Sequence, residues 1–100
     1  MSNQNTMPNT HWVKQRAIAY HDSFHLSGQS ISAIVKGKPV SYSIGSEFII
    51  PDRHASVNCT IQQINKKYAV VKYCQQFDHR SFGANKITKE IGMIEIEYFK

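Results

Sequence analysis

Residues 57–73 read VNCTIQQINKKYAVVKY, and this stretch decides the fold. Val57, Cys59 and Ile61 alternate with polar residues, and that period of two predicts a strand with one buried face. The run YAVVKY predicts a second strand, and the intervening NKK is a plausible three-residue loop. The stretch therefore predicts an antiparallel hairpin. Its expected register is Ile61 opposite Val71, Cys59 opposite Tyr73 and Gln63 opposite Ala69.

The only two cysteines, Cys59 and Cys74, lie on opposite faces of this hairpin. Their Cβ atoms point apart, so an intramolecular disulfide would require a different register. Two cysteines are also too few for a disulfide framework. We expect two reduced thiols.

Upstream, Glu47 to Ile50 predicts a short strand that ends at Pro51. The segment Ile31 to Ile44 fits two structures. As a helix it would be capped by Ser30 and end near Gly37 and Pro39. As a hairpin around 36–39 it would pair apolar residues on one face, and we favour this interpretation. The expected pairs are Val35 with Val40, Ala33 with Tyr42, and Ile31 with Ile44.

Nearer the N-terminus, Val13, Ala17, Tyr20 and Phe24 recur with helical spacing. They predict a helix from about His11 to Tyr20, with Thr10 as its N-cap. Residues 1–9 are polar and predict a disordered tail. We therefore expect a single globular domain over residues 10–100.

Downstream, residues 75–89 read QQFDHRSFGANKITK and predict a long polar loop. The chain then closes with a predicted strand over Met93 to Phe99. In it, Ile94, Ile96 and Tyr98 alternate with two glutamates, which indicates one wet face.

These elements predict an α+β, mainly β fold, with an N-terminal helix packed on a small, strongly bent antiparallel sheet or barrel. From Ile44 to Phe99, the order of strand, irregular loop, long hairpin, loop and closing strand resembles small SH3-like barrels. That resemblance implies a binding or oligomer-forming role, since such barrels include nucleic-acid-binding, protein-binding and oligomeric members. The chain also resembles orphan products of bacterial mobile gene cassettes or phages.

The charge is positive overall and unevenly distributed. The net charge is +5, with +7 over residues 1–89 and −2 over residues 90–100. A basic body suggests attraction to polyanions. No run approaches the ~18 apolar residues of a membrane helix. The first ten residues lack the features of a secretory signal, so we expect a cytoplasmic protein without a membrane partner.

Nucleic-acid binding is the favoured function, as a non-catalytic accessory module. If the predicted loop folds beside the hairpin, its cations would join those of the hairpin in one phosphate-binding surface. Two aromatic residues would stack on unpaired bases, which favours single strands. The cations are Lys66, Lys67, Lys72, Arg80, Lys86 and Lys89, and the aromatic residues are Tyr68 and Phe82.

The alternative is a homo-oligomeric module that binds protein or a small ligand. A domain of this length buries a modest core, and self-association would cover further apolar surface. The final strand has more apolar residues than one buried face requires. The predicted self-association residues are Met93, Ile94, Ile96, Tyr98 and Phe99.

Catalytic and cofactor sites are not predicted. The spacing of His21 and His25 suits a metal on a continuous helix, but no motif supplies further ligands. Metal-free RNA cleavage by His79 and Arg80, beside Asp78 and Phe82, is the one catalytic hypothesis, and we favour binding over it. We expect no metal and no cofactor.

Overall fold

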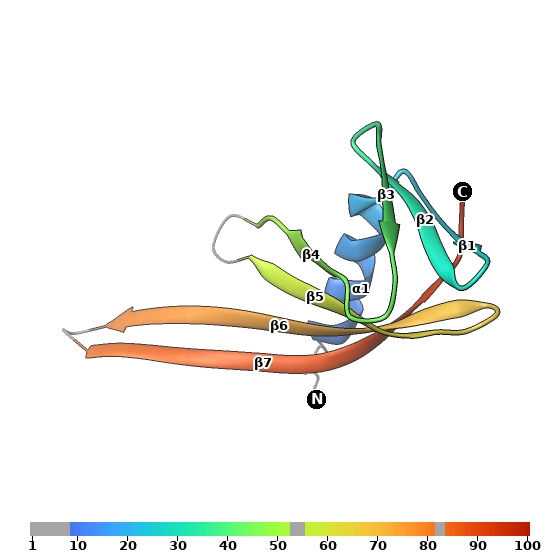
Figure 1. Cartoon of the computed structure of the whole chain (residues 1–100). Helices are drawn as coiled ribbons and strands as arrows, with labels where there is room; N and C mark the ends of the chain where they lie inside the picture. Colours follow the sequence, from blue (N-terminus) through green and yellow to red (C-terminus); the bar gives the residue numbers. More distant parts are fainter. Residues whose placement is uncertain (1–8, 53–55, 82–83) are drawn as a thin grey trace, which may run out of the picture.

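The structure, a computed structural model, describes residues 9–52, 56–81 and 84–100, with the backbone alone at residues 9, 77–81 and 84–88. Within these ranges the chain forms a helix followed by seven strands (Figure 1). They are α1 (Asn9–Tyr20), β1 (Ser23–Ser27), β2 (Ser30–Val35), β3 (Lys38–Tyr42), β4 (Glu47–Ile50), β5 (Val57–Ile64), β6 (Tyr68–Ser81) and β7 (Ala84–Glu97).

The strands form two antiparallel sheets, β1-β2-β3 and β4-β5-β6-β7. The predicted α+β, mainly β class with an N-terminal helix is confirmed. The two sheets meet where Phe24 of β1 pairs with Phe99, just beyond β7, through N···O distances of 2.9 and 2.7 Å. Over the described residues the sheets do not close into a barrel.

Helix α1 ends at Tyr20, and Phe24 is the second residue of β1. The Asp22 backbone N–H donates to the Ile34 carbonyl at 2.7 Å, and the Asp22 carboxylate accepts from the Gly37 N–H at 3.0 Å. These bonds direct the chain along β2, so β1 forms in a segment for which no strand was predicted. Phe24 is nevertheless buried, as we expected when we placed it on the apolar face of the predicted helix.

The hairpin that we favoured for residues 31–44 is confirmed as β2 and β3, with a different register. Ile31 pairs with Tyr42 and Ala33 with Val40, because the turn has two residues instead of four. Lys36 and Gly37 form it with φ of 51° and 79°, the positive values that a type I′ turn requires. The register shift is even, so the buried face is unchanged. Ile44 falls outside the strand and is 68% exposed.

The hairpin of β5 and β6 follows the predicted register for Cys59–Tyr73 and Ile61–Val71. A β-bulge then intervenes, so Ala69 pairs with Ile64, and the predicted Gln63–Ala69 pair is wrong. A bulge adds one residue to one strand and increases the local twist. The two cysteines are free, as expected, with Cys59 buried and Cys74 half-buried.

The predicted loop over residues 75–89 is wrong. Strands β6 and β7 pair without interruption from Tyr68–Glu97 to Ser81–Ala84. The closing strand therefore begins at Ala84 instead of Met93. Antiparallel backbone bonding needs no apolar face, and this polar stretch has no hydrophobic alternation that would reveal it.

A single core lies between the two sheets and α1. Val13 and Ala17 of α1 are fully buried, and α1 packs against β7 and β4. His21 lies in this core among aromatic rings. In the described part of the chain, no helix is long and apolar enough to span a membrane.

Candidate nucleic-acid interface

A two-stranded extension of the larger sheet is the most distinctive surface feature. Strand β5 pairs with β6 only as far as Gln75, whereas β6 and β7 stay paired to Ser81 and Ala84. We call residues 76–81 and 84–89 the arm, which projects from the body in Figure 1. Strands of this length extend about 20 Å at ~3.4 Å per residue.

The arm is basic. Its charged residues are Asp78, Arg80, Lys86 and Lys89, and His79 adds a group that ionises near neutral pH. The register places His79 opposite Lys86 and Gln76 opposite Lys89. Both strands of the arm therefore contribute cations.

The six predicted phosphate-binding cations do not form one compact surface. Lys66 and Lys67 lie in the turn between β5 and β6, at the opposite end of β6 from Arg80. Lys67 and Arg80 are thirteen positions apart along the chain, about 45 Å at ~3.4 Å per residue of strand. Lys72 lies between them, opposite Thr60 and Met93. Three of the six are in the arm: Arg80, Lys86 and Lys89.

The two predicted stacking residues also occur at opposite ends of β6. Tyr68 begins the strand and is half-buried, and its carbonyl accepts a hydrogen bond from Tyr98 at 3.1 Å. Phe82 follows the last residue of β6 and lies outside the described residues. Tyr68 therefore lies at the body end of the hairpin, away from the arm.

Most residues predicted for self-association contribute to the core. Ile94 and Ile96 are buried, and Tyr98 and Phe99 pack against the core as half-buried residues. The Tyr98 hydroxyl donates to the Asn65 carbonyl at 2.6 Å. Met93, on the other face of β7, is 53% exposed. Of this set, only Met93 is largely accessible in the folded chain.

Sequence reasoning missed a second group of exposed residues around Met93. Ile49, Cys74 and Ile91 lie in one cross-strand row, completed by Asn58. Because β7 begins at Ala84, Ile91 shares a sheet face with Met93. Extending the alternation of residues 93–97 two positions upstream would have revealed it.

His21 is the most enclosed histidine among the described residues, only 4% exposed. Its Nδ1 donates to the Ala17 carbonyl at 2.8 Å, and its Nε2 accepts from the Tyr42 hydroxyl at 2.9 Å. Burial lowers the His21 pKa, against smaller opposing effects of the Ala17 bond and the Asp22 charge. Both ring nitrogens are engaged inside the core, so His21 is a structural residue here.

His21 and His25 do not share a helical face, because α1 ends before both of them. His25 is exposed on β1. The described residues contain no group of three or more side chains suited to a metal ion. His79, Arg80 and Asp78, the residues of the RNA-cleavage hypothesis, lie in the arm at positions where the structure describes the backbone alone. Phe82 lies outside the described residues.

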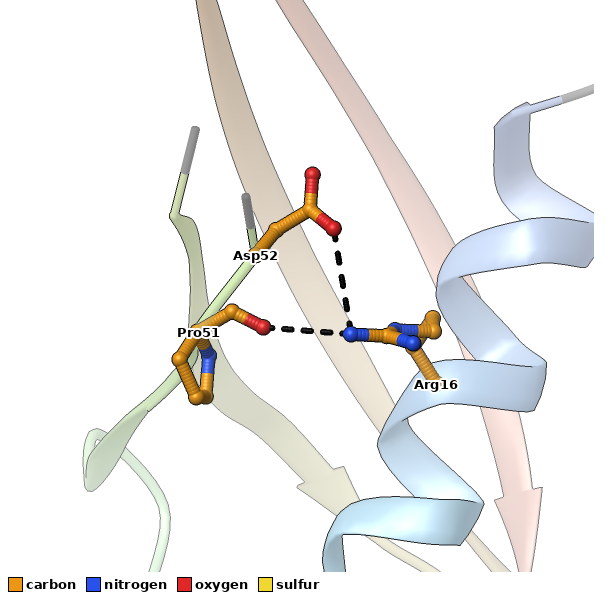
Figure 2. Close-up of polar contacts among 3 residues, drawn as sticks. All are labelled: Arg16, Pro51 and Asp52. Atoms are coloured by element: carbon orange, nitrogen blue, oxygen red, sulfur yellow. Dashed lines mark hydrogen bonds and ion pairs between the residues drawn. The ribbon is translucent and has the colours of Figure 1, made fainter. Parts of the chain in front are cut away.

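Arg16 of α1 is a cation with a structural partner. Its Nη2 donates to the Pro51 carbonyl at 3.2 Å and lies 3.8 Å from Asp52 Oδ1 (Figure 2). Its guanidinium also lies 5.5 Å from the centre of the Trp12 ring. An exposed ion pair contributes about 0–1 kcal/mol, so its main effect is to position α1 beside the end of β4.

Comparison of the chain with protein-family models, with curated proteins and with solved structures finds no match.

Proposed function

We propose that this chain is a non-catalytic, basic nucleic-acid-binding module of the cytoplasm, and that the arm is its binding element. The observation that supports this most is the continuous pairing of β6 and β7 beyond the end of β5. It gives a narrow ribbon with three cations and one carboxylate. When the cations of such a ribbon neutralise phosphate groups, counterions are released from the nucleic acid, and this release favours binding.

The dimensions of the arm suit a duplex groove. The major groove of B-DNA is about 12 Å wide and 8.5 Å deep, and it admits a two-stranded β-ribbon. The two strands of a ribbon are about 4.8 Å apart. Gln76 and Asn85, at the two ends of the arm, are of the residue types that bind adenine edges.

We favour duplex over single-stranded nucleic acid. The expectation of single strands required Tyr68 and Phe82 in one site. Tyr68 is at the body end of β6, about 45 Å from the arm's far end at ~3.4 Å per residue. A ribbon that enters a groove needs no aromatic platform.

The experiment compares two charge reversals of equal size. Arg80→Glu with Lys86→Glu alters the arm, and Lys66→Glu with Lys67→Glu alters the turn at the other end of β6. Both change the net charge by the same amount, so they have equal long-range electrostatic effects. Binding is measured by fluorescence anisotropy of labelled duplex DNA at low salt.

We expect the arm variant to weaken binding by at least about tenfold, which is ~1.4 kcal/mol, and the turn variant by about threefold or less. Equal losses in both variants would mean that net charge alone attracts the DNA. Unchanged binding by the arm variant would exclude the arm as the binding element. Circular dichroism of both variants establishes that they fold.

A further inference from the structure

We propose that the exposed face of the larger sheet is a homodimer interface, covered by a second copy of this chain. The face is centred on Ile49, Cys74, Ile91 and Met93, which we call the outer patch, with Lys72 among them. The inference does not depend on the proposed nucleic-acid binding.

The outer patch is more apolar than a solvated sheet face. Ile49, Ile91 and Met93 are 54%, 60% and 53% exposed. An antiparallel sheet with one wet face normally alternates apolar inward and polar outward residues. Here β7 presents two apolar residues in adjacent rows, Ile91 and Met93, and β4 presents Ile49 in the row of Ile91. Exposed apolar surface of this kind marks an interaction site.

The register places Cys74, Ile91 and Met93 close together on β6 and β7, with Ile49 at the far end of the same row as Ile91. In one row Ile49 and Ile91 flank Asn58 and Cys74, and in the next row Met93 is opposite Lys72. Directly opposed Cβ atoms are about 4.5–5.5 Å apart. The core occupies the other face of the sheet, where Val71 and Ile94 are buried, and the first turns of α1 border the patch beside Met93 and Glu95.

The charges around the patch favour a second copy as the partner. Lys72 lies within it, while Glu47 and Glu95 lie at its borders on β4 and β7. Within the ranges that the structure describes, none of these three side chains forms an ion pair. In a two-fold interface every contact occurs twice, so Lys72 of each copy can face a border glutamate of the other.

Face-to-face sheets pack about 10 Å apart, close enough for apolar side chains to interdigitate and for such ion pairs to form. Nucleic acid fits this face less well, because Glu47 and Glu95 would repel phosphate. A domain of about 100 residues also buries a smaller share of its surface than larger domains do. Dimerisation would remove additional apolar surface from water.

Sedimentation velocity of the full chain over a range of concentrations tests the proposal. We expect a reversible dimer, and Ile91→Glu should raise its dissociation constant by at least about tenfold. Ile91 is 60% exposed, so this change should leave the fold intact. Ile44→Glu is the matched control, because Ile44 is 68% exposed but lies between β3 and β4, outside the patch.

Alkylation of Cys74 by iodoacetamide is the second measurement. Cys59 is buried, and burial raises its pKa to about 12, so Cys74 is the reactive thiol. The alkylation rate should fall as protein concentration rises and the dimer forms, and it should lose this dependence in Ile91→Glu. A chain that stays monomeric would overturn the proposal. So would a dimer that Ile91→Glu and Ile44→Glu affect equally, or a Cys74 rate independent of concentration.

Discussion

Replacing His21 by Phe is the sharpest test of how the core is held together. His21 donates to the Ala17 carbonyl at 2.8 Å and accepts from the Tyr42 hydroxyl at 2.9 Å. Its ring makes edge contacts with Phe24 and Phe48. Phenylalanine would preserve an aromatic ring at this position but would accept and donate no conventional hydrogen bond.

The expected cost follows from the hydroxyl that loses its acceptor. Tyr42 is only 6% exposed, and an unsatisfied buried polar group costs about 1–3 kcal/mol. The Ala17 carbonyl loses a partner too, at about 1 kcal/mol. We therefore expect His21→Phe to lower the free energy of unfolding by about 2–4 kcal/mol. Tyr42→Phe should rescue part of that loss, because it removes the orphaned hydroxyl.

Urea denaturation followed by circular dichroism measures the free energy of unfolding of all four proteins in the cycle. The double variant should be more stable than the sum of the single changes predicts, with a coupling energy of about 1–2 kcal/mol. Additive losses would refute the hydrogen bond between His21 and Tyr42 as a stabilising contact. A cost below about 0.5 kcal/mol for His21→Phe, the usual scale of surface changes, would refute its burial.

Three further predictions concern pH and packing. Because burial lowers the His21 pKa, its neutral form stabilises the fold fully above pH 6.5, and this stability should be lost progressively as pH falls below 6.5. Urea midpoints measured across this range should therefore decline in the native chain and decline less in His21→Phe. Burial raises the Tyr42 pKa from 10.0 to about 12, so stability should also fall as pH rises from 10 towards 12, which tyrosinate absorbance would detect on unfolding. Gly92→Ala would place a Cβ 2.7 Å from the Tyr73 hydroxyl and should cost about 1–3 kcal/mol; in a Tyr73→Leu background the measured cost should fall below about 1 kcal/mol.

The body of the fold could be predicted from local patterns. The alternation in residues 57–73 determines which residues are buried, and Cys59 and Ile61 have the partners that it predicts. Periodicity cannot locate a bulge, since one extra residue changes pairing only from Gln63 onward. The short turn at Lys36 and Gly37 was missed for a related reason: the four-residue alternative buries the same face.

The arm could not be predicted, because its residues are mostly polar and show no hydrophobic alternation, which is the main signal of a strand. The role of His21 was equally hidden. Its partners Ala17 and Tyr42 come from the helix and from β3, and only the tertiary fold brings them together. The outer patch was partly predictable, since Met93 was already placed on the outward face.

The most direct test of the proposed function is the salt dependence of duplex DNA binding by the native, nuclease-treated chain. Each phosphate contact contributes about −0.9 to the slope of log binding constant against log salt concentration for B-DNA. The three arm cations, Arg80, Lys86 and Lys89, therefore predict a slope of about −3, with duplex bound more tightly than single strands. No binding at low salt, where even weak phosphate contacts are detectable, would contradict the proposal that the arm binds nucleic acid.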